Sequence, residues 1–173
     1  MPRILLGTVI TALAVALVVA LFALPGSAAK SGNSVAEPNT KTQRVLKLES
    51  AQRLANVALR TCAKKGFPVT VTVVDRDGIT LATLRSEDAT GATVPVALGK
   101  AYAAAGFQSP TSGLQEAAKT QPGFISLPGF VILPGGEPIR IGTQLVGGVG
   151  VSGAPSGDID DQCAMAGLKA ISH

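Results

Sequence analysis

Histidine and large aromatic residues are nearly absent from this chain of 173 residues. It has no tryptophan, one tyrosine and one histidine, and that histidine is the last residue, His173. A single terminal histidine excludes a Ser-His-Asp or Cys-His catalytic arrangement and argues against a metal centre. Aromatic residues make up 3%, and Lys64-Lys65 is the only basic pair. The chain therefore lacks the basic, aromatic-bearing surface typical of nucleic-acid-binding proteins.

One long apolar run is present, and it lies at the N-terminus. Residues 4–24 follow Arg3 and precede a Pro-Gly break and small residues that end at Ala29. This order is typical of a secretory signal, although a run of this length can also span a bilayer. We therefore predict that residues 1–29 are a signal peptide or an uncleaved N-terminal anchor. In either case the folded part is expected to be extracellular or at the cell surface.

The remaining sequence divides into a short polar segment and one domain. Residues 30–44 show no apolar periodicity and are predicted to be a flexible tether. Residues 45–173 have the length of a single domain with its own core. The formal net charge of +4 is scattered, which indicates a solvated surface and weakly favours an anionic small ligand or an anionic lipid surface.

Apolar periodicity predicts four helices and five short strands in this domain. The predicted helices are 48–65, 96–107, 114–119 and 156–171. The predicted strands are 68–74, 79–85, 130–133, 138–141 and 144–151. Tight turns join neighbouring strands, so we expect a mainly antiparallel sheet packed with helices. The fold class is α+β, with an α-β-α arrangement of layers.

Two cysteines occur in a chain that is predicted to be exported, where a disulfide is permitted. Cys62 lies four residues after Ala58 on the apolar face of the first helix. Cys163 lies four residues after Ile159 on the apolar face of the last helix. Both side chains should therefore point to the core, and we predict a disulfide between them. Two buried free thiols are the alternative.

Several motifs, in this order, resemble one family. They are VTVTVVDRDGITLATLR, GKAYAAAGFQSPTS and LPGGEPIRIGTQLVGGVGVSGAPSGDIDDQCAMAGL. Their order is similar to the GlcG/HbpS family of small haem-binding proteins, which includes the C-terminal domain of PduO-type cobalamin adenosyltransferases. The resemblance covers about residues 48–172. It implies haem as the cofactor, assembly into a homo-oligomer and, for exported members, a membrane sensor protein as a partner.

The resemblance also suggests where haem would bind. The family's haem-binding threonine lies seven residues before the lysine of a Lys-Ala pair, which corresponds to Thr93 here; an ordinary helix cap is the alternative. Lys100 or Arg85 could pair with a haem propionate, but an exposed surface lysine is an equal alternative for Lys100. Tyr102 could ligate ferric iron, although packing is the favoured interpretation.

Other candidate ligands are disfavoured. His173 lies at a chain end that is expected to fray, and Met165 is predicted to be a core residue of the last helix. The family's iron-binding Glu-x-x-Glu positions fall at Arg60 and Ala63, so iron storage is not expected there. The turn carboxylates, Asp75 among them, are expected to bond their own backbone.

We therefore predict a secreted or membrane-tethered, oligomeric haem-binding protein, with a role in haem, iron or redox sensing. Two alternatives remain. One is an enzyme that degrades haem or acts on a small 2-hydroxy or 2-oxo acid. The other is a non-catalytic assembly or interaction module.

Overall fold

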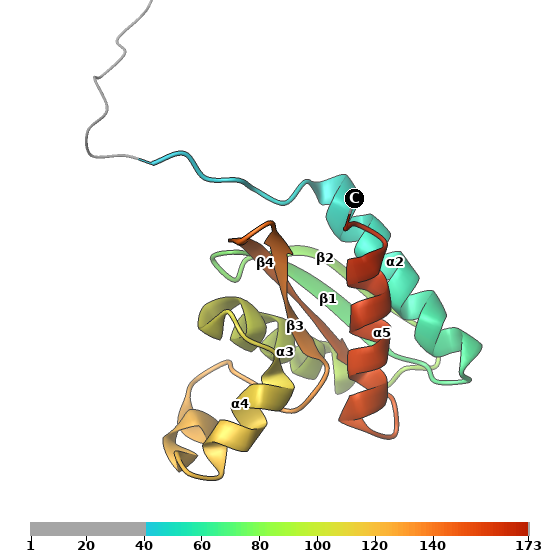
Figure 1. The fold of residues 1–173 in the computed structure, drawn as a ribbon. Coiled ribbons are helices and arrows are strands. Elements are labelled where there is room, and N and C mark those ends of the chain that lie inside the picture. The colour runs from blue at the N-terminus through green and yellow to red at the C-terminus, as the bar shows by residue number, and fades with distance from the viewer. Residues whose placement is uncertain (1–40, 173) are drawn as a thin grey trace, which may run out of the picture. The chain divides into compact units, whose positions relative to one another are not determined.

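A four-stranded antiparallel sheet forms the middle of the computed structural model (Figure 1). The strand order is β2-β1-β4-β3. The strands are β1 (Thr70–Asp75), β2 (Thr80–Arg85), β3 (Gly136–Ile141) and β4 (Gln144–Ser152). The structure describes residues 41–172, so the predicted signal or anchor, most of the predicted tether and His173 lie outside the described residues.

Helices cover both faces of the sheet. The helices are α2 (Leu48–Lys64), α3 (Thr93–Phe107), α4 (Thr111–Ala118) and α5 (Gly157–Lys169), with a short 3-10 helix, η1 (Pro122–Ser126). Figure 1 shows α2 and α5 side by side on one face, and α3 lies on the other face with α4 packed against it. The α+β class is therefore confirmed. Between residues 41 and 172, no helix is both long and apolar enough to cross a membrane.

The fifth predicted strand, residues 130–133, is wrong. This segment is irregular and packs along α3 instead of joining the sheet. The Val131 N–H donates to the Gly99 carbonyl at 3.1 Å, and the ring of Phe130 stacks on that of Tyr102. Ile132 is buried in a cluster with Leu114 of α4. The run is apolar because its first three residues pack against α3 and α4, a situation that periodicity cannot distinguish from a strand.

One face of the sheet forms the main core with α2 and α5. Alternate residues of the two central strands point to this face, among them Val71, Val73, Val149 and Val151. A disulfide joins Cys62 of α2 to Cys163 of α5, with a Cα–Cα distance of 5.7 Å and both residues fully buried. The predicted disulfide is confirmed, and it links the first and last helices of the domain.

Glycine makes up the middle of the opposite face, under α3. A Cβ atom at Gly150 would lie 2.0 Å from the Ala97 carbonyl oxygen, and one at Gly148 would lie 2.4 Å from the Ala101 carbonyl oxygen. Such approaches are too close for any side chain, so only glycine fits. Because the facing residues of α3 are alanines, the helix backbone lies directly on β4. Because of this close packing, Lys100, the one charged residue of α3, is enclosed.

Candidate ligand-binding site

Lys100 is the charged residue enclosed between α3 and the rest of the fold. Its Nζ donates to Asp160 Oδ2 at 2.8 Å and to the Val151 carbonyl oxygen at 2.9 Å. The side chains of Lys100 and Asp160 are only 3% and 4% exposed. The alternative of an exposed surface lysine is therefore wrong. Burying an ammonium is expensive unless it is paired and hydrogen-bonded, and here both conditions are met.

The Gly-Gly turn before β3 makes room for this ion pair. Gly135 has a φ of +116°, which favours glycine, and a Cβ atom there would lie 2.8 Å from Lys100 Nζ. A Cβ atom at Gly136 would lie 2.6 Å from the Lys100 carbonyl oxygen. The Gly135 N–H donates to Asp161 Oδ1 at 2.6 Å, and the Ala154 N–H donates to Asp160 Oδ1 at 3.1 Å. Asp160 and Asp161, near the start of α5, thus hold the backbone at Ala154 and Gly135 in place through these hydrogen bonds. Their carboxylates also lie near the positive end of the α5 dipole.

Burial controls the titration of the carboxyl groups around this pair. Burial raises the pKa of Asp160, and the hydrogen bond and charge of Lys100 oppose that rise. Burial also raises the pKa of Asp161, against the Gly135 N–H. The carboxylate of Glu137 on β3 has no hydrogen-bond or ion-pair partner among residues 41–172. Its burial, and then the charge of Asp161, raise its pKa to about 7.

Thr93 is the first residue of α3, and it does not act as the predicted helix cap. Ala92 is the capping residue, and no side chain caps the helix. The Thr93 hydroxyl instead donates to the Thr90 carbonyl oxygen at 2.7 Å. It also lies 2.7 Å from the hydroxyl of Thr70 on β1. Because the Thr93 hydroxyl hydrogen is used in the bond to Thr90, the Thr70 hydroxyl is the donor in the bond between the two threonines. The Thr93 oxygen therefore accepts one hydrogen bond, and one of its two lone pairs remains for a further contact.

Arg85 lies on the same side of the sheet as Thr93. It pairs with Thr70 across the strands, and directly opposed residues project to the same face. Because α3 packs on β1, β3 and β4, Arg85 and its neighbour Thr83 remain exposed beside the helix. An Arg85 Nη1 hydrogen bond to the Ala89 carbonyl holds the loop that leads into α3.

Tyr102 is separated from these residues. It lies nine positions after Thr93, which is two and a half helical turns, so the two side chains leave opposite sides of α3. The ring of Tyr102 stacks on Phe130 with centroids 4.7 Å apart. It also fills the space beside Gly78 in the β1–β2 turn, where a Cβ atom would lie 2.3 Å from the ring. The Asp75 carboxylate of that turn accepts two backbone N–H groups at 2.9 Å. The predicted packing role of Tyr102 and the predicted turn role of Asp75 both agree with the structure.

A cavity of about 490 Å³ lies beside the buried ion pair. Its walls come from α3, the Gly153 loop, the Pro134 turn and the first turn of α5. Lys100, Ser152 and Asp160 line it. Ser152 is paired with Thr70 across the sheet, so the row Thr93, Thr70, Ser152 runs from the start of α3 to this cavity. The sequence pointed to Thr93 and Lys100 as site residues. It did not point to Thr70 and Ser152 of the row, or to Asp160 in the cavity wall.

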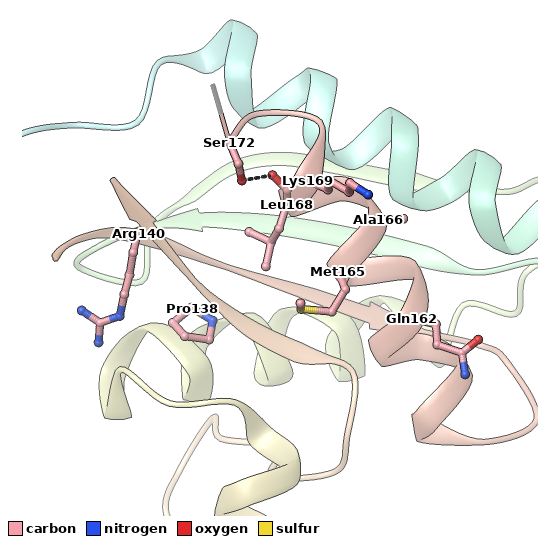
Figure 2. A pocket seen from close by; sticks show the side chains of 8 residues that line it. All are labelled: Pro138, Arg140, Gln162, Met165, Ala166, Leu168, Lys169 and Ser172. Carbon is pink, nitrogen blue, oxygen red and sulfur yellow. Dashed lines mark hydrogen bonds between the residues drawn. The ribbon is translucent and has the colours of Figure 1, made fainter. Parts of the chain in front are cut away.

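A larger groove of about 600 Å³ lies between the β3 edge and α5, and it contains none of the predicted site residues. Figure 2 shows Met165 on α5 beside this groove, facing Pro138 of β3. Met165 is 53% exposed, so the prediction of a core methionine is wrong. Arg60 and Ala63 are exposed on α2. Within residues 41–172, no group of three or more histidine, cysteine or acidic residues could hold a metal ion.

Known proteins share both the sequence and the fold. A protein-family model described as haem degrading protein HbpS-like matches residues 46–169. An uncharacterized 15.0 kDa protein from the dhaT-dhaS intergenic region of Citrobacter freundii is 32% identical over 122 residues. That match covers 65% of this chain and 84% of the relative.

Two solved structures extend the comparison. A double mutant of HbpS from Streptomyces reticuli is 38% identical, with a TM-score of 0.76, over 79% of this chain and 94% of that chain. A PduOC:heme complex is 25% identical, with a TM-score of 0.69, over 75% of this chain and 99% of that chain. Both solved structures share the α+β fold of this chain over nearly their whole length.

Proposed function

This chain belongs to the HbpS-like family, as its motifs predicted, and we propose that it binds haem. The observation that carries the proposal is the family match over residues 46–169, together with the likeness to a PduOC:heme complex. The domain of this chain has a fold similar to that of the PduOC:heme complex over nearly the whole length of that chain.

The residues at the start of α3 fit haem as a weak, exchangeable ligand. Thr93 keeps one lone pair for iron, and its neutral hydroxyl is a weaker ligand than histidine or thiolate. Arg85 is exposed on the same face and has guanidinium N–H groups left for a propionate. Haem, when bound, would supply its own redox chemistry. The chain's part would be to hold and orient it.

Two earlier candidates fit haem less well. Lys100 is already paired with Asp160, and a propionate would have to compete with that carboxylate. Tyr102 lies on the opposite side of α3 from Thr93 and is stacked on Phe130. We therefore assign Thr93 and Arg85, and not Lys100 or Tyr102, to the haem site.

The cellular role is also a proposal. The N-terminal sequence supports export, with a signal or anchor at residues 1–29 and a tether at residues 30–44. The family resemblance supports a homo-oligomer and a membrane sensor protein as a partner. We propose an extracellular or cell-surface protein that takes up haem and reports or buffers it.

A haemin titration of the purified chain tests the function. We expect a shifted Soret band that saturates at a fixed stoichiometry, and no release of iron or biliverdin when a reductant is added. Biliverdin formation would indicate an enzyme. An unchanged spectrum at equimolar haemin would contradict the proposal. Bovine serum albumin and the unfolded, reduced chain serve as the positive and negative references.

A further inference from the structure

Several polar groups that line the cavity beside Lys100 have no hydrogen-bond partner among residues 41–172. Ser152 is 8% exposed and lines the cavity, and its hydroxyl has no hydrogen-bond partner among residues 41–172. Lys100 Nζ uses two of its three hydrogens, on Asp160 and Val151. Because the Ser152 hydroxyl opens onto the cavity and is not sealed from solvent, it remains available to a polar group that enters the cavity.

The first turn of α5 adds two donors to the same cavity. This helix has 13 residues, and its capping residue, Ser156, makes no side-chain cap. The N–H groups of Gly157 and Asp158 have no partner among the described residues, and both residues line the cavity. The first N–H groups of a helix have no partner within the helix itself and lie at the positive end of its dipole. The cavity thus combines an accessible hydroxyl without a partner in the protein, an ammonium and two amide donors.

Acceptors face these donors across the cavity. Asp158 is exposed at the cavity rim, and the amide of Gln115 on α4 lines the opposite wall without a partner in residues 41–172. An anionic ligand would meet the exposed carboxylate of Asp158. A cationic ligand would meet the positive end of the α5 dipole. A neutral group that both donates and accepts avoids both repulsions.

The remaining walls are apolar. The polar groups are surrounded by four apolar residues, which are Val96, Leu133, Pro134 and Pro155. The volume of about 490 Å³ is in the range of small-molecule sites, which combine apolar walls with a few placed polar groups. A short hydrocarbon chain that bears hydroxyl groups has the matching character.

We propose that this cavity binds a small neutral molecule with vicinal hydroxyl groups, such as a short polyol. One hydroxyl accepts from the α5 amides and Ser152, and its neighbour donates to Asp158 or Gln115. The inference goes beyond haem binding and does not depend on it, because Thr93 and Arg85 do not line this cavity.

The test uses two ligands that differ in one group. Erythritol carries four hydroxyl groups, and erythronate replaces one terminal alcohol with a carboxylate. Each is titrated into the ¹⁵N-labelled full chain at pH 7 and followed by amide chemical shifts. We expect erythritol to give saturable shifts at Gly157, Asp158 and Ser152, and to bind more tightly than erythronate.

Variants separate the polar contacts from general effects. Ser152→Ala should weaken erythritol about fivefold, the usual effect of losing one hydrogen bond. Asp158→Asn should leave erythritol within about twofold and tighten erythronate about threefold, because a repelling charge is removed. Ser126→Ala, in η1 and outside the cavity, is the matched control and should change neither affinity.

Three results would overturn the inference. They are the absence of saturable shifts with erythritol, tighter binding of erythronate than of erythritol, and erythritol shifts that Ser152→Ala leaves unchanged. A dispersed amide spectrum of each variant establishes that it is folded. Haemin titration of the same samples is independent, so a failure of haem binding and a failure of this site are distinguishable.

Discussion

Lys100 and Asp160 form an ion pair of 2.8 Å that is almost completely enclosed between α3 and α5. The two residues are 60 positions apart and join the two sides of the sheet at one end. An enclosed pair of this kind contributes little to stability compared with apolar residues of the same shape. We therefore attribute the presence of this ion pair to its position in the wall of a polar cavity and not to a contribution to stability.

Breaking the pair on one side should destabilise the fold strongly. Lys100→Met leaves the Asp160 carboxylate buried without its cation, and we expect a loss of about 3–5 kcal/mol in the free energy of unfolding. The double variant Lys100→Met with Asp160→Leu should lose less than the single variant, because no charge remains buried. Urea unfolding measures both. Lys119→Met is the control, since Lys119 pairs with Glu116 on the surface and should change stability by less than about 1 kcal/mol.

Glu137 should make stability depend on pH near neutrality. Its pKa is raised from 4.5 to about 7 in the folded state, so folding takes up a proton between these values. Stability from this group is present below about pH 4.5 and is lost as the pH rises through 7. Glu137→Gln should therefore stabilise the protein by about 1–3 kcal/mol at pH 8 and have little effect at pH 4. Equal effects of the substitution at both pH values would contradict this, and the exposed Glu87→Gln is the control.

Opening the disulfide should weaken the domain. The bridge closes a loop of 101 positions between Cys62 and Cys163. In the chain-entropy model, a loop of about 100 residues accounts for up to about 4.7 kcal/mol. We expect the double Cys→Ala variant to lose about 2–5 kcal/mol in guanidinium unfolding. Reductant should lower the stability of the natural chain by a similar amount and leave the variant unaffected.

Thr93 should influence haem through its hydroxyl. Thr93→Val keeps the size of the side chain and removes the oxygen, so we expect a changed Soret band and weaker haemin binding with an intact fold. Thr70→Val is the matched control, because it removes only the partner hydroxyl and leaves Thr93 available. If both variants bind haemin as the natural chain does, Thr93 has only a structural role.

The purified protein should be an oligomer larger than a dimer. Large apolar side chains remain exposed on several surfaces, among them Ile79, Ile125 and Met165, and association would cover some of them. Multi-angle light scattering at micromolar concentration measures the mass directly. A monomer at this concentration would refute the expectation.

Local patterns predicted the four α-helices and four of the five strands, although α3 and α4 each begin three residues before the predicted start. The limits of α2 and α5 and the turn at Gly78 follow from periodicity and from glycine and proline positions, because these are properties of neighbouring residues. The segment 130–133 was misread because its apolar residues face helices and not a sheet. For Lys100 the sequence left two alternatives, a propionate partner and an exposed surface lysine, and the buried pair with Asp160 was neither of them. Its place among Ala97, Ala101 and Ala104 on the buried side of α3 could have indicated its burial.

The sequence by itself determined the family, the α+β class, the helix faces that carry the two cysteines and the residue that corresponds to the family's threonine. These follow from short-range order, which the chain carries whether or not it is folded. Only the tertiary structure decided that Lys100 meets Asp160, that Thr93 meets Thr70 and that Ser152 and the start of α5 enclose a cavity. Those contacts depend on how closely α3 lies on the glycines of β4, and the distance between a helix and a sheet is set by all the side chains between them.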